Sequence, residues 1–65
     1  MQVKLNGELR EIQAATLGQL VSSYHLDPEA VVIERNGVIA PKEDWATTPL
    51  NNGDQVEIVS FVGGG

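Results

Sequence analysis

Two Asn-Gly pairs, Asn6-Gly7 and Asn36-Gly37, constrain the fold of this chain more than any other feature. Both residues of such a pair tolerate the positive φ angles of a tight hairpin turn. The segment before the first pair, residues 1–5, alternates apolar and polar residues, and the segment before the second pair, residues 31–35, is rich in β-branched residues. Both patterns favour strands, so the sequence predicts two β-hairpins.

The return strand of the first hairpin, residues 8–13, has an irregular pattern. Its apolar residues Leu9 and Ile12 have opposite parity along the chain. Side chains alternate between the two faces of a strand, so these two cannot share a face. We therefore expect either a β-bulge or an early end of this strand.

A single short helix is predicted between the hairpins. Thr16 and Gln19 have the spacing of a capping box, and Asp27-Pro28 is a stop signal. We expect Gly18 in its first turn to allow close packing on the sheet. The apolar stripe of this helix, which we expect to face the core, consists of Leu17, Leu20, Val21 and Tyr24.

The second half of the chain adds one more strand. The second hairpin returns through residues 38–40, residues 43–45 form one helical turn that brings Trp45 to the edge of the core, and residues 55–61 form the last strand. The first and last strands can lie parallel in the centre of the sheet. The prediction is an α+β, ubiquitin-like β-grasp fold, with a mixed sheet of about five strands and one main helix on one face.

Composition excludes several classes of function. The chain has 65 residues, no cysteine and a formal charge of −5, with nine acidic and four basic residues. An acidic surface disfavours nucleic acid, and the lack of cysteine excludes thiol chemistry on the chain itself. The sequence shows neither an apolar run of membrane-spanning length nor a secretory signal, so we expect a cytoplasmic protein.

Few side chains could perform catalysis. His25 is the only histidine, and it has no suitably spaced partner for catalysis or metal binding. Glu43-Asp44 is best interpreted as an exposed acidic turn rather than a pair of catalytic carboxylates. We therefore expect a substrate or binding protein rather than an enzyme, with no bound cofactor and no metal.

The last strand leaves one question open. Val56 and Ile58 share one face, whereas Val59 and Phe61 fall on the other. Either a bulge shifts the register, or an apolar patch faces solvent and could dock a partner. The possible docking patch comprises Val59, Phe61 and Val62.

Three glycines, Gly63, Gly64 and Gly65, follow that strand. We predict a β-grasp domain over residues 1–61 and a flexible glycine tail over residues 62–65. A frayed end is the simplest interpretation of such a tail. The alternative is a substrate tail that threads into a narrow enzyme site, where adenylation would activate the carboxylate of Gly65 toward sulfur or an amine.

The whole chain resembles the sulfur carriers of bacterial thiamine biosynthesis, the ThiS family. The resemblance rests on segments 5–8, 16–20, 32–37 and 52–59 and on the ending Phe61-Val62-Gly63-Gly64-Gly65. It implies that a ubiquitin-activating-type adenylyltransferase uses ATP to adenylate Gly65, and that a relay fed by a cysteine desulfurase forms a thiocarboxylate. Thiazole synthase would then take the sulfur into the thiazole ring. Gly64 and Gly65 would be the reactive tip and Gly63 an extra tether.

Two alternatives remain at this point. A related ubiquitin-like carrier could use the same chemistry for molybdopterin synthesis, tRNA thiolation or protein conjugation. A β-grasp interaction domain with an inert tail would perform no such chemistry.

Overall fold

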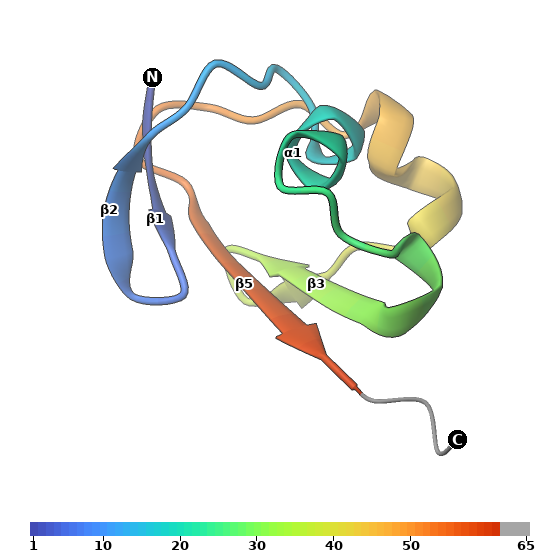
Figure 1. The fold of residues 1–65 in the computed structure, drawn as a ribbon. Helices are drawn as coiled ribbons and strands as arrows, with labels where there is room; N and C mark the ends of the chain where they lie inside the picture. Colours follow the sequence, from blue (N-terminus) through green and yellow to red (C-terminus); the bar gives the residue numbers. More distant parts are fainter. Residues whose placement is uncertain (62–65) are drawn as a thin grey trace.

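A computed structural model describes residues 1–61 of the chain. One mixed sheet contains five strands in the order β2-β1-β5-β3-β4 (Figure 1). The strands are β1 (Gln2–Leu5), β2 (Glu8–Glu11), β3 (Val31–Arg35), β4 (Val38–Ile39) and β5 (Gln55–Ser60). β5 lies parallel to β1 and antiparallel to β3, which confirms the predicted β-grasp arrangement.

Both predicted hairpins form at the Asn-Gly pairs. Asn6 and Gly7 have φ angles of 49° and 83°, and Asn36 and Gly37 have φ angles of 54° and 85°. These are the left-handed conformations that a two-residue hairpin turn requires. The turns fix the pairings of β1 with β2 and of β3 with β4.

The return strand of the first hairpin ends early, so Leu9 and Ile12 do not have to lie on one face of the same strand. β2 ends at Glu11, and its pairing with β1 is regular from Leu5 opposite Glu8 to Gln2 opposite Glu11. Leu9 is 70% exposed, whereas Ile12, one residue beyond the strand, is buried. Because the strand ends before Ile12, the side chain of Ile12 can lie in the core without a bulge in β2.

The main helix, α1 (Leu17–Ser23), is shorter than its apolar pattern predicts. Its start is as expected, because the backbone N–H of Gln19 donates to Thr16 Oγ1 at 3.1 Å. Its end lies well before Asp27-Pro28, since His25 adopts a left-handed φ of 57°. Tyr24 therefore caps the helix and is 40% exposed, which corrects its predicted place in the core.

Two 3₁₀ segments complete the fold, η1 (Pro28–Ala30) and η2 (Lys42–Thr47). η2 confirms the predicted helical turn, and Trp45 is buried with its indole N–H donating to the carbonyl of Ala40 at 2.9 Å. No helix within residues 1–61 has the length and apolar character needed to cross a membrane.

The core lies between α1 and the sheet (Figure 1). Its most deeply buried side chains come from β1, α1, β3 and β5: Val3, Leu17, Leu20, Ile33 and Val56. Burying an aliphatic side chain of this size contributes about 1.5–3 kcal/mol. We call the opposite surface of the sheet the open face, because no helix covers it within the described part of the chain.

Candidate functional site

The residues predicted to carry chemistry come after β5 in the sequence. β5 is the central strand of the sheet (Figure 1). The backbone N–H of Phe61 donates to the carbonyl of Ala30 at 2.9 Å. This bond continues the register in which Val31 lies opposite Ser60. Residues 62–65, with the predicted docking residue Val62 and the tail glycines Gly63, Gly64 and Gly65, lie outside the described residues. The described part of the site is thus the surface around the end of β5.

An apolar patch lies on the open face beside this strand end. It consists of Val59, Phe61 and Val32, which are 56%, 48% and 39% exposed, and we call it the tail-side patch. Val32 and Val59 are directly opposite each other across β3 and β5, so they share a face.

The pairing of β3 with β5 decides between the two alternatives left open by the sequence. It runs without interruption from Arg35 opposite Val56 to Val31 opposite Ser60. A bulge would have moved Val59 toward the core, and none is present in this ladder. Val59 and Phe61 are therefore exposed, and their role in docking stays a prediction.

Asn6 fixes the position of β5 relative to the first hairpin. Its side-chain Oδ1 accepts a hydrogen bond from the backbone N–H of Ile58 at 2.8 Å, and its own N–H donates to the carbonyl of Val56 at 2.9 Å. The same residue also forms the turn, with a φ of 49°. One asparagine thus supplies both the hairpin geometry and a link to the strand that leads to the tail.

Asp54 fixes the start of β5. It is the one buried charged or polar residue in the described chain, at 7% exposure. Its Oδ2 accepts from Arg35 Nε at 2.9 Å and from the backbone N–H of Asn51 at 2.9 Å, and its Oδ1 accepts from Asn36 Nδ2 at 3.1 Å. The sequence predicts only a turn here, because the side chains that bind Asp54 come from a hairpin about 20 residues away and leave no local signal.

The protonation of Asp54 is set by opposing effects. Burial acts to raise the pKa of this carboxyl group. The hydrogen bonds from Asn51, Asn36 and Arg35, together with the charge of Arg35, outweigh burial and leave the pKa of Asp54 below its ordinary value. Asp54 is therefore a structural anion that ties the second hairpin to the central strand.

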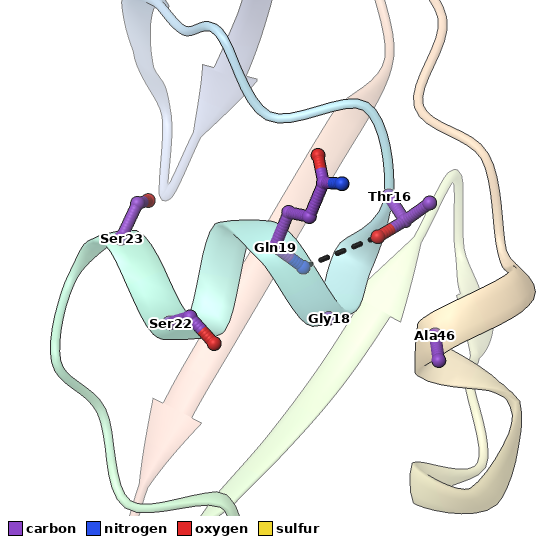
Figure 2. Close-up of a pocket in the computed structure, with 6 residues that line it drawn as sticks. All are labelled: Thr16, Gly18, Gln19, Ser22, Ser23 and Ala46. Carbon is purple, nitrogen blue, oxygen red and sulfur yellow. Dashed lines mark hydrogen bonds between the residues drawn. The ribbon is translucent and has the colours of Figure 1, made fainter.

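A shallow groove lies elsewhere, between α1 and η2 (Figure 2). Its lining residues are small or polar: Thr16, Gly18, Gln19, Ser22, Ser23 and Ala46. A Cβ on Gly18 would lie 3.2 Å from the Cα of Ala46, so this glycine permits close packing on η2 and not, as predicted, on the sheet. The groove has no charged side chain, and its lining offers no acid or base that could activate the hydroxyl groups of Thr16, Ser22 and Ser23 as nucleophiles.

The remaining candidate groups are scattered. His25 is exposed in the turn after α1, and Glu43 and Asp44 are exposed in the first turn of η2. Within residues 1–61 no three His, Cys, Asp or Glu side chains are grouped closely enough to hold a metal ion.

Comparison with known proteins gives consistent results. The model of the ThiS family matches residues 3–65. The sulfur carrier protein ThiS of Bacillus subtilis is 44% identical over 50 residues, which cover 77% of this chain and 76% of that protein. The thiazole synthase of Paramagnetospirillum magneticum is 41% identical over 66 residues, covering all of this chain. The chain spans only 20% of that thiazole synthase and of a second one, from Magnetococcus marinus.

A solved structure has the same fold. The crystal structure of the thiamine biosynthesis protein ThiS from Geobacter metallireducens matches with a TM-score of 0.84 and 30% identity, and the match covers 100% of both chains. Given a family model that spans nearly the whole sequence and a fold shared over its full length, this chain belongs to the ThiS family.

Proposed function

We propose that this protein is a sulfur carrier for formation of the thiazole ring in thiamine biosynthesis. Membership of the ThiS family is the observation that carries the proposal. The similarity to the Bacillus subtilis sulfur carrier and to two thiazole synthases supports it. In this role the protein is a co-substrate of other enzymes and not itself a catalyst.

The reactive group in this proposal is the carboxylate of Gly65. An oxygen of that carboxylate attacks the α-phosphorus of ATP on an adenylyltransferase of the ubiquitin-activating type, and pyrophosphate leaves. A relay from a cysteine desulfurase carries the sulfur as a persulfide, whose outer sulfur attacks the carbonyl carbon while AMP leaves with the electrons of the broken C–O bond. A thiol then attacks the relay sulfur of the resulting acyl disulfide, forms a disulfide with it, and releases the other sulfur on Gly65. The product is a thiocarboxylate, from which thiazole synthase takes the sulfur.

The described domain supports this chemistry by providing a docking surface. Residues 62–65 span at most about 13–14 Å when extended, so an enzyme that reaches Gly65 must lie close to Phe61. Ordering three glycines costs roughly 3–6 kcal/mol, which contacts elsewhere have to offset. The tail-side patch is apolar, exposed and adjacent to the strand end, and we propose that it makes these contacts.

Genetic complementation tests the pathway. A bacterial strain that lacks its own thiazole sulfur carrier should grow without thiamine when it carries the full-length chain, and should fail to grow with a chain that lacks Gly65. We expect the shortened chain to accumulate to the same level, because α1 and the five strands of the sheet lie within residues 1–61. Growth supported equally by both chains would contradict the role of Gly65. Rescue of a molybdopterin or tRNA-thiolation defect instead would favour a related carrier.

A further inference from the structure

Two acidic residues face each other in the middle of the open face. Glu34 on β3 and Glu57 on β5 are direct partners in the antiparallel ladder. Directly opposite side chains have Cβ atoms about 4.5–5.5 Å apart, and like charges in this arrangement are destabilising. Both carboxylates lie on the open face, since Ile33 and Val56, their neighbours along the strands, are buried on the core side.

No salt bridge within residues 1–61 neutralises this pair. Of the four basic side chains, Arg10, Arg35 and Lys42 form salt bridges with Glu8, Asp54 and Glu29, respectively. Lys4 lies on the open face, opposite Gln55 in the β1–β5 pairing, and lines a small pocket with Glu57, but it forms no salt bridge with either glutamate. Within residues 1–61, Glu34 and Glu57 therefore have neither a salt-bridge partner nor a hydrogen bond to their carboxylates.

The acidic pair is continuous with the tail-side patch. Glu57 precedes Val59 by two residues on β5, and Glu34 follows Val32 by two residues on β3, so all four side chains share the open face. A partner that covers Val59 and Phe61 to reach the tail extends directly over the two carboxylates. The surface that such a partner meets is an apolar patch bordered by two carboxylates that form no salt bridge within residues 1–61.

We propose that the Glu34–Glu57 pair binds a basic side chain, preferably an arginine, of the thiazole synthase. This inference rests on the proposed function. A guanidinium group is planar and can donate to two carboxylates at once, whereas an ammonium group acts as a point charge. Complex formation would replace a cross-strand repulsion by two charge-assisted hydrogen bonds, so the pair would favour a basic partner over an acidic one.

Removal of each charge should have opposite effects on folding and on binding. We expect Glu34→Gln and Glu57→Gln to leave the melting temperature unchanged or to raise it by roughly 1–4 °C, because the repulsion is relieved. We expect each variant to bind the cognate thiazole synthase about 3–10-fold more weakly, as measured by calorimetry. The dependence of affinity on salt between about 0.05 M and about 0.5 M should become shallower.

Glu43→Gln is the matched control. It removes the same charge from an exposed glutamate on η2, away from the open face, and should leave affinity and salt dependence unchanged. The inference is overturned if the open-face variants bind as tightly as the unaltered chain, if Glu43→Gln has an equal effect, or if the unaltered chain does not bind the synthase. If Glu34→Gln and Glu57→Gln weakened binding to the adenylyltransferase alone, thiazole synthase would not be the partner that this pair binds. The proposed function is tested separately, because conversion of Gly65 to a thiocarboxylate requires no thiazole synthase.

Discussion

Arg35 Nε lies 2.9 Å from Asp54 Oδ2, and this ion pair joins the second hairpin to the start of the central strand. Asn36 strengthens the link, since its Oδ1 accepts from the backbone N–H of Gln55 at 2.9 Å while its Nδ2 donates to Asp54. Arg35 and Asn36 therefore hold the start of β5 against the second hairpin.

Replacement of Asp54 should destabilise the fold substantially. In Asp54→Ala, Arg35, Asn36 and the Asn51 N–H lose their acceptor in a partly buried position, and we expect a loss of roughly 2–4 kcal/mol in the free energy of unfolding. Urea denaturation measures this loss. Asp44→Ala is the control, because Asp44 is exposed on η2, and it should change stability by less than about 0.5 kcal/mol. If the two substitutions lowered the free energy of unfolding equally, the hydrogen bonds and ion pair of Asp54 would contribute nothing to stability.

The Asp54 carboxylate should make the free energy of unfolding depend on pH. Because the pKa of Asp54 is lower in the folded chain than in the unfolded chain, its contribution is fully present above the unfolded value of about 3.9. The contribution is lost as pH falls through the folded value. The difference in unfolding free energy between the unaltered chain and Asp54→Asn should thus be constant from about pH 5 to pH 7 and shrink below about pH 4. A difference that grows on acidification would contradict the assignment.

Gly18→Ala should disturb the contact of α1 with η2. Alanine is the better helix former by about 1 kcal/mol, yet its Cβ would lie 3.2 Å from the backbone of Ala46. Since the nearby atoms belong to the backbone, η2 must shift, and we expect a net loss of about 1 kcal/mol. Trp45, the only tryptophan, lies beside this contact, so its fluorescence emission should change in the folded state. A more stable variant with unchanged emission would show that η2 accommodates the methyl group freely.

The tail-side patch should affect partner binding without affecting folding. Val59→Ser and Phe61→Ser remove exposed apolar area, and each should weaken the complex with the adenylyltransferase by about tenfold or more while changing the free energy of unfolding by less than about 1 kcal/mol. Leu9→Ser is a matched control, because Leu9 is 70% exposed on the edge strand β2, two strands away from β5. If Leu9→Ser weakened the complex equally, docking would not be localised to the strand end.

Local chemistry explains which parts of the fold could be predicted. Each Asn-Gly turn requires only two residues with left-handed backbone, and Thr16 with Gln19 marks a helix start within one turn. The helix end was predicted wrongly because a left-handed conformation at His25 is uncommon for a residue other than glycine. The prediction that Tyr24 lies in the core is wrong for the same reason, because the apolar spacing predicts one more helical turn than forms.

The site was predictable only in part. The sequence predicts the alternation of Val56, Ile58 and Val59, but parity alone does not decide whether a strand contains a bulge. The structure excludes a bulge, because the pairing of β5 with its partner strand β3 is regular. The Asp54 network and the facing pair Glu34 and Glu57 depend on long-range pairing, so the sequence contains no local pattern that predicts them.

The most direct test of this account is the intact mass of the chain after activation. Purified full-length protein is incubated with ATP, magnesium, a cognate adenylyltransferase shown to be active, and sulfide. We predict a mass increase equal to the exchange of one oxygen for sulfur, localised to Gly65 by fragmentation and absent without ATP. An unchanged mass with the active enzyme would contradict the account, as would a sulfur atom located anywhere other than Gly65.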